Sequence, residues 1–495
     1  MAPDDTRSAT DGKTSDRTAP EVSWRDHLVM LLNVGAEIEH GLMVQYLYAA
    51  YSIDTRGHPP DVVQKLESWR DHILTVAREE MGHFITVQNL LRLLGAPMNL
   101  ARQNFPWDVE YYPFPFRLEP FSLSSVAAYA FTEAPPLKTL ETDAARLTSG
   151  GKRIHPAMAK RYILYKRFDY DEIRRRVDLR MPRDVEAHSV DVIYSEIINL
   201  LKDEDRIPDS VFQEDTYSAQ ADWDDWGRRY RPAPKMLTAD GSPAEKTSED
   251  DIQTVNETNM LVMPVGTRTE AIKALQLVSE QGEAPHMGTA ELEEISHFDR
   301  FLVIFQELKE MGDDFRPARD VASNPSVRKD VRGSTQITHP RTRSWAKFAN
   351  IRYRMLLAFL GHRLKSGAKH RVPVQDRETM LIHRTFAEMY NIKTVSNLLM
   401  QMPLGESGKD AERFAGPPFE TPFDLRMPHS EVETWMLHRE LVKAAIRQAG
   451  ELLEASDDDD TAAAYLRTQL PIDRQTLAWT EAILTGLGVT RGQLT

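Results

Sequence analysis

No cysteine occurs in this 495-residue sequence, and its absence removes a whole set of chemistries. Disulfides, a cysteine nucleophile, thiolate-held iron–sulfur clusters and thiolate-ligated haem are excluded. Any bound metal must then be held by oxygen and nitrogen ligands, chiefly carboxylate and imidazole.

Long apolar runs and an excess of basic residues are also missing. No stretch reaches the roughly 18 apolar residues of a membrane-spanning helix, and the N-terminus lacks the basic-then-apolar pattern of a signal peptide. The formal net charge of −14 argues against nucleic acid or an anionic membrane as a partner, because both attract concentrated lysine and arginine. A cytoplasmic location is the default expectation.

Helical periodicity is the dominant pattern of the sequence, and no strand-period pattern is strong, so we predict an all-α protein. We expect a disordered tail over 1–22, a helical bundle over 23–312 with an insertion at about 204–262, and a C-terminal helical region over 313–495. The expected helices are Ser23–Ser52, Asp61–Leu94, Ser122–Glu133, Val185–Lys202, Arg268–Glu280, Thr289–Met311, Trp345–Leu364, Arg377–Met402, Ser430–Ala455 and Asp473–Leu487.

Acidic residues and histidines interrupt helix faces that should be buried. Glu80 and His83 stand within an apolar stripe of three and four spacings in the second expected helix. Glu294 and His297 interrupt a similar stripe in a later helix, and Glu39 interrupts one in the first helix. A buried carboxylate without a partner costs on the order of several kcal/mol, so these side chains need a partner.

A metal ion would meet that need. A Glu-x-x-His spacing places both side chains on one helix face, one turn apart, where they can bind a common cation. Two such pairs with a glutamate from each of two other helices form the ligand set of carboxylate-bridged di-iron bundles. Carboxylate and imidazole together favour iron, with manganese as an alternative.

Two metal-free explanations stay open. Glu80 and Glu294 would pair with Arg78, Arg92 or Arg300 at the bundle edge, or the histidines would be hydrogen-bonded core groups. A single Glu-x-x-His pair is weak evidence of a metal site. Two pairs on apolar stripes, with a third inward glutamate, favour the metal.

The sequence does not decide which further glutamate completes the set of metal ligands. Glu196 lies between Ile193 and Leu200 and would face inward if its helix belongs to the bundle. Glu280 lies near the end of the expected helical hairpin, and Glu133 ends a short helix before two prolines. We favour Glu196, with Glu280 next.

Several short segments together carry a family resemblance. They are 39–53 (EHGLMVQYLYAAYSI), 78–83 (REEMGH), 131–135 (FTEAP), 279–283 (SEQGE), 296–301 (SHFDRF) and 416–420 (GPPFE). These segments resemble the ferritin-like domain of the iminophenyl-pyruvate dimer synthases, which act in violacein and rebeccamycin-type bisindole pathways. The resemblance implies a ferritin-like four-helix bundle with insertions.

The resemblance departs from the family in the helix near 185–202. The family shows a Gly-Glu-Leu/Phe-Tyr pattern there, whereas Val192 stands here in place of that glutamate. Glu196 lies one turn later and is a candidate substitute. The chain is also much shorter than the bisindole-pathway enzymes, so the domain assignment transfers better than the reaction.

The favoured function is a non-haem iron-dependent oxidative enzyme of specialised metabolism, of the antibiotic-biosynthesis kind. It would hold one or two iron ions and use O2 on an amino-acid-derived or aromatic small molecule, with imine or enamine coupling as one form. The alternatives are a ferroxidase or iron-handling protein without an organic substrate, and a metal-free helical interaction protein. The sequence is compatible with a homodimer, and it does not indicate a catalytic residue other than the metal ligands.

Overall fold

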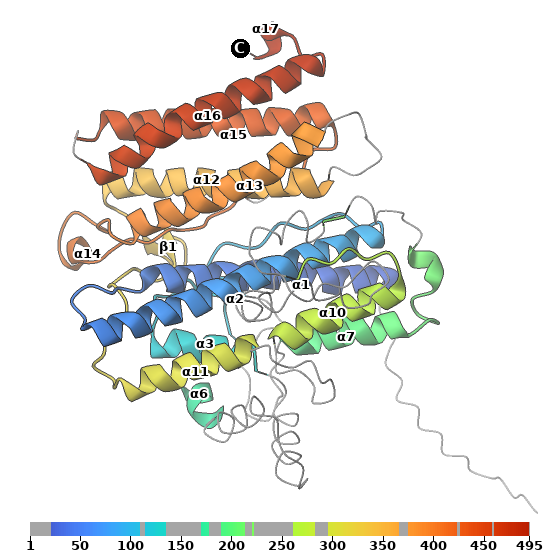
Figure 1. Cartoon of the computed structure of the whole chain (residues 1–495), viewed down its shortest axis with the longest axis horizontal. Coiled ribbons are helices and arrows are strands. Elements are labelled where there is room, and N and C mark those ends of the chain that lie inside the picture. The colour runs from blue at the N-terminus through green and yellow to red at the C-terminus, as the bar shows by residue number, and fades with distance from the viewer. Residues whose placement is uncertain are drawn as a thin grey trace, which may run out of the picture.

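Two groups of helices lie one above the other in this computed structural model, with the N-terminal group below and the C-terminal group above in Figure 1. The expectation of a predominantly helical protein is confirmed. The structure describes residues 21–108, 114–134, 170–177, 190–212, 220–221, 261–282, 296–365, 375–422, 426–457 and 460–494.

The N-terminal group is organised around two long paired helices, α1 (Trp24–Ser52) and α2 (Pro60–Leu93). Helix α1 begins where the Ser23 side chain accepts a hydrogen bond from the backbone N–H of Asp26, and α2 begins with a proline, which the first helical turn tolerates. The other members are α3 (Leu123–Thr132), α6 (Tyr170–Arg176), α7 (Val190–Lys202), the short 3-10 helix η1 (Asp209–Phe212), α10 (Arg268–Gly282) and α11 (His297–Glu310).

The remaining two positions of the bundle are each filled by two shorter helices. In Figure 1, α3 and α7 lie end to end, and α11 and α10 do the same. Helix α3 packs against α11, and α7 packs against α10 and α1. The ends of these short helices therefore meet beside the middle of α1 and α2.

The C-terminal group is built mainly from four long helices that pack in pairs. Helix α12 packs against both α13 and α15, and α15 packs against α16. Arg352 is fully buried and joins three of these helices, because its guanidinium donates to Glu388 at 3.1 Å and also to Asp473. The elements are β1 (Pro325–Ser326), β2 (Thr335–Gln336), α12 (Pro340–Lys365), α13 (Gln375–Leu399), α14 (Lys409–Glu412), α15 (Glu431–Glu454), α16 (Thr461–Gly486) and α17 (Arg491–Leu494), and β1 and β2 pair in parallel.

One helix begins earlier than the sequence suggests. We expected the last long helix to start at Asp473, after Pro471, because proline usually interrupts a helix. Helix α16 instead begins at Thr461 and continues through Pro471. Asp460 caps its N-terminus by accepting a hydrogen bond from the N–H of Ala462, and burial of Leu466 holds the first turns in place.

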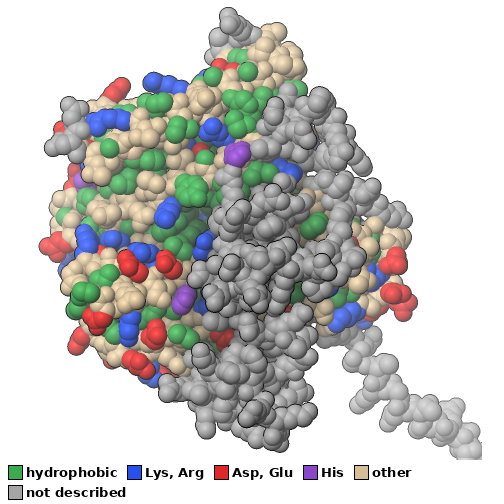
Figure 2. Space-filling view, in the orientation of Figure 1, with side chains coloured by type: hydrophobic (Ala, Val, Ile, Leu, Met, Phe, Trp, Pro, Cys, Tyr) green, Lys and Arg blue, Asp and Glu red, His purple; other side chains and the backbone are tan. Residues whose placement is uncertain are grey.

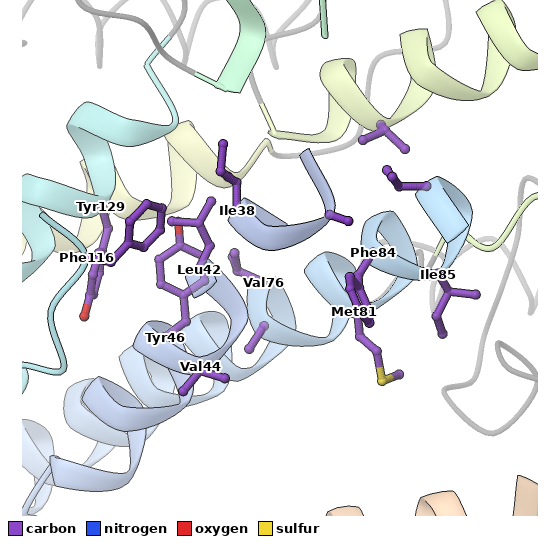
Figure 3. Packing of buried hydrophobic residues seen from close by; sticks show 14 of the residues in the cluster. Ile38, Leu42, Val44, Tyr46, Val76, Met81, Phe84, Ile85, Phe116 and Tyr129 are labelled. Atoms are coloured by element: carbon purple, nitrogen blue, oxygen red, sulfur yellow. The ribbon is translucent and has the colours of Figure 1, made fainter. Parts of the chain in front are cut away.

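The bundle core extends into the C-terminal group. Leu42 and Tyr46 of α1 pack with Tyr129 of α3 inside the bundle (Figure 3), where the two tyrosine rings lie 4.8 Å apart. The same buried cluster includes Tyr353 and Phe386 of the C-terminal helices. Because one buried cluster includes residues from both sides of residue 313, the domain boundary expected there stays a prediction.

Parts of the expected insertion pack on the bundle. Ile207, Ala221 and Val262 are buried, and the side chain of Asn89 in α2 donates to the backbone carbonyl of Ala221 at 2.8 Å. The remainder of the insertion and the expected tail up to residue 20 lie outside the described residues. None of the described helices is both long and apolar enough to cross a membrane.

Candidate metal centre

Buried carboxylates and two histidines gather where the ends of the short helices meet α1 and α2. Glu39 comes from α1, and Glu80 and His83 come from α2. Glu133 is the residue that ends α3, and His297 is the first residue of α11. All five residues are at most 2% exposed.

These side chains form two groups with the geometry of a metal site. In one group, ligand atoms of Glu39, Glu80 and His83 lie within 4.8 Å of one another. In the other, ligand atoms of Glu80, Glu133 and His297 meet the same limit. Glu80 belongs to both groups.

Glu80 turns one oxygen toward each histidine. Its Oε2 lies 3.0 Å from Nδ1 of His83, and its Oε1 lies 3.1 Å from Nδ1 of His297. The two imidazole rings stack with their centroids 5.5 Å apart. A carboxylate that faces two imidazole nitrogens can therefore contribute one oxygen to each ligand group.

The outer nitrogen of each histidine has its own acceptor. Nε2 of His83 lies 2.9 Å from Oε1 of Gln281, and Nε2 of His297 lies 3.0 Å from Oε2 of Glu79. With the proton on Nε2, each ring donates outward and leaves the Nδ1 lone pair for a metal. Arg300 lies 3.7 Å from Glu79 and neutralises that outer carboxylate.

Two tyrosines hold two of the carboxylates. Tyr194 of α7 donates its hydroxyl hydrogen to Oε1 of Glu39, and Tyr46 of α1 donates to Oε1 of Glu133. Each bond occupies one carboxylate oxygen and leaves the other directed toward the histidines. Such outer partners fix the orientation of metal ligands.

The electrostatics of the site favour a bound cation. Burial, reinforced by the charge of Glu80, raises the pKa of Glu39 to about 8. Burial opposes a charge on His83 as well, but the neighbouring carboxylates of Glu39 and Glu80 raise its pKa to about 10. Oε2 of Glu39 lies 3.7 Å from Nδ1 of His83, and Nδ1 of His297 lies 3.1 Å from Oε1 of Glu80, but neither buried atom makes a hydrogen bond of regular geometry with the described residues. A cation would satisfy both atoms, so the donor set fits iron or manganese.

The space at the centre is small. A cavity of about 10 Å³ is lined by Glu39, Glu80, His83, Glu133 and Tyr194, together with apolar residues of α1 and α10. All three members of the first ligand group line this cavity and His297 does not, so its volume concerns the first group alone. It accommodates one ion or one water, since a water needs roughly 10–15 Å³ of such space.

The structure separates the three candidates for the remaining carboxylate. Glu196 points away from the site: its side chain is 46% exposed and lies 3.6 Å from His27. The buried face of α7 carries Tyr194 instead, two residues earlier, which is more than half a turn away around the helix. Glu280 is half-buried and belongs to neither group, whereas Glu133 belongs to one. The structure thus places Glu133, and not the expected Glu196, beside the two histidines.

Glu294 was also expected among the ligands and lies in 283–295, outside the described residues. Glu79, Gln281, Tyr46 and Tyr194 were not singled out from the sequence. A signal for Glu79 was present in the sequence, because the stretch from Met81 to Leu91 contains no Asp, Glu, Lys or Arg. A helix segment without such residues is typically buried on every face, and Glu79 stands just before it.

A comparison with protein families decides the identity of the bundle. The family model described as Ferritin-like matches residues 32–306. The chain belongs to the ferritin-like family. This match spans all five residues of the two ligand groups.

Two curated proteins are similar to this ferritin-like chain. Dichlorochromopyrrolate synthase of Lentzea aerocolonigenes is 26% identical over 82% of the chain and 37% of its own length. The 2-imino-3-(indol-3-yl)propanoate dimerase of Chromobacterium violaceum is 32% identical over 23% of the chain and 14% of its own length. The resemblance to the dimer synthases is thereby confirmed, although the chain spans well under half of each relative. No solved structure matches the chain.

Proposed function

We propose that this ferritin-like protein is a non-haem iron-dependent oxidative enzyme of specialised metabolism. The observation that carries the proposal is Glu80, which faces a histidine with each of its two oxygens inside a buried site. Two metal ions fit this arrangement better than one, because each histidine has its own additional carboxylate, Glu39 or Glu133.

Each residue has a defined task in this proposal. Glu39, Glu80 and His83 would hold one ion, and Glu80, Glu133 and His297 would hold the other. Bound iron would supply the transfer of electrons to O2, which no side chain of the chain can perform.

The surrounding residues prepare the ligands. Gln281 and Glu79 keep the histidine protons on Nε2, and the two tyrosine hydroxyls orient Glu39 and Glu133. Burial removes bulk water, which strengthens every charge interaction within the site.

The substrate class comes from the relatives. One relative is named as a dimerase of an indolyl imino acid and the other as a dichlorochromopyrrolate synthase. We therefore propose an amino-acid-derived or aromatic substrate and the coupling of imine or enamine units. The chain matches only part of each relative, so membership of the ferritin-like family does not by itself assign this coupling reaction to it.

The small volume of the centre favours a second candidate, a ferroxidase or iron-handling protein. A cavity of about 10 Å³ admits an ion but no organic molecule. In that case the amount of O2 consumed would depend on the amount of Fe(II) added, and the addition of an aromatic imino acid would not change it. The first candidate instead requires O2 uptake that continues as the organic compound is consumed.

Metal loading under anaerobic conditions tests both candidates together. The metal-free protein is incubated with Fe(II), passed over a desalting column and analysed for iron per chain, with Mn(II) in a parallel sample. We expect two ions per chain, one for each ligand group. A protein that retains neither metal would refute both candidates and leave a metal-free interaction role.

A further inference from the structure

A second and much larger cavity lies between the bundle and the C-terminal helices. Its volume is about 970 Å³, and its lining residues come mainly from α1, α2, α12 and α13. Pockets that bind small organic molecules measure roughly 300–1,000 Å³. The cavity therefore has the size of a ligand site, unlike the space at the candidate metal centre.

The cavity and the metal centre lie on different faces of α2. Leu74, Ala77 and Met81 line the cavity, whereas Glu80 and His83 face the centre. Figure 3 shows Met81 pointing away from Leu42 of α1. None of the described lining residues of the cavity belongs to either ligand group.

The cavity walls are largely apolar and aromatic. Tyr353, Phe386 and Phe419 supply rings, and Met43 and Met389 supply flexible thioethers. Aromatic rings pack face to edge or offset against a bound ring, and methionine adapts to its outline. Such walls suit a flat aromatic molecule.

The charged groups of the cavity are mainly basic. Arg78, Arg300 and Lys393 line it, against Asp71 as the acidic lining residue among those described. Burial and the neighbouring Arg300 lower the pKa of His72, so this histidine stays neutral near pH 7. In Figure 2, apolar and basic side chains both appear in the band between the two groups of helices.

These basic residues line a cavity in a chain whose formal net charge is −14. Because Arg300 already neutralises Glu79, the attraction for an anionic ligand comes from Arg78 and Lys393. A guanidinium binds a carboxylate through two parallel hydrogen bonds, and partial burial strengthens that attraction. We propose that the cavity is a second binding site, which takes an aromatic molecule that carries a carboxylate. The site does not use the metal, so the proposal extends beyond the function given above.

Binding to the metal-free protein tests the proposal directly. The probes are 1-naphthaleneacetate and its neutral analogue 1-naphthaleneacetamide, which share shape and fluorescence and differ in charge. We expect the acetate to bind at least about tenfold more tightly, by fluorescence titration and calorimetry, because charge-assisted bonds contribute more than neutral ones. Equal affinities for the two probes, or no binding of the acetate at millimolar concentration, would overturn the proposal.

Two variants locate the bound probe. Arg78→Gln should remove most of the preference for the acetate, and Met389→Trp should weaken both probes by filling the cavity. Arg70→Gln is the matched control, because Arg70 lies on the same helix but does not line the cavity. Circular dichroism establishes that each variant is folded, and the comparison of the two probes on the unmodified protein needs no variant. Unchanged binding in folded Arg78→Gln and Met389→Trp would place the probes elsewhere and refute the assignment.

Discussion

Replacement of Glu133 by glutamine tests the carboxylate that the sequence left undecided. Oε2 of Glu133 lies 3.8 Å from Nδ1 of His297, and its Oε1 accepts the hydroxyl of Tyr46. Glutamine keeps the shape and retains an acceptor for Tyr46, but it removes the negative charge that a metal ligand needs. The variant should therefore fold and bind the ion of the Glu80, Glu133 and His297 group poorly, while the group of Glu39, Glu80 and His83 still binds its own ion.

The size of the effect follows from the role of the residue. Loss of an outer partner of a metal ligand typically costs about 10- to 100-fold in affinity, so loss of the charge on a direct ligand should cost more than about 100-fold, or about 2.7 kcal/mol. Glu196→Gln is the matched control. Its carboxylate is 46% exposed and pairs with His27 at the surface, where such a pair contributes about 0–1 kcal/mol.

Competitive titration with a fluorescent chelator, using Mn(II) under anaerobic conditions, measures both affinities. The metal-free proteins should unfold at similar urea concentrations, which separates a loss of binding from a loss of structure. If Glu196→Gln lost metal and Glu133→Gln did not, the choice of Glu133 over Glu196 would be wrong. If neither variant lost metal, the second ligand group would be wrong as a whole.

Three further results are expected. Glu39→Gln should lower the number of bound metal ions from two per chain to one, as measured by elemental analysis. Glu80→Gln should abolish the binding of both ions, because Glu80 belongs to both ligand groups. Glu79→Gln should weaken metal binding by about 10- to 100-fold in the same chelator titration without lowering the ion count at saturation, since Glu79 contacts the outer nitrogen of His297. Arg352→Met should lower the free energy of unfolding by about 3–5 kcal/mol in urea titrations, because the substitution leaves two buried carboxylates of the C-terminal group unpaired. Metal uptake per folded chain should not change. A loss of unfolding free energy below about 1 kcal/mol would contradict this reasoning.

The sequence by itself determined the helical class and predicted the first part of the candidate site. The apolar stripes of the first two long helices placed Glu39, Glu80 and His83 on inward faces, and the structure brings them together. Periodicity succeeds there because both helices are long and their stripes run for many turns. The spacing of a single helix also fixes which side chains share a face, whatever surrounds it.

Only the tertiary structure shows that Glu133 lies beside the histidines and that Glu196 lies at the surface. Helix α7 is short, so its stripe contains too few residues to show that Tyr194, and not Glu196, occupies the centre of the buried face. Glu133 ends a separate short helix, and nothing in its local sequence reports that this end lies beside the start of α11. Contacts between ends of different helices depend on how the helices pack, and local periodicity carries no information about that packing.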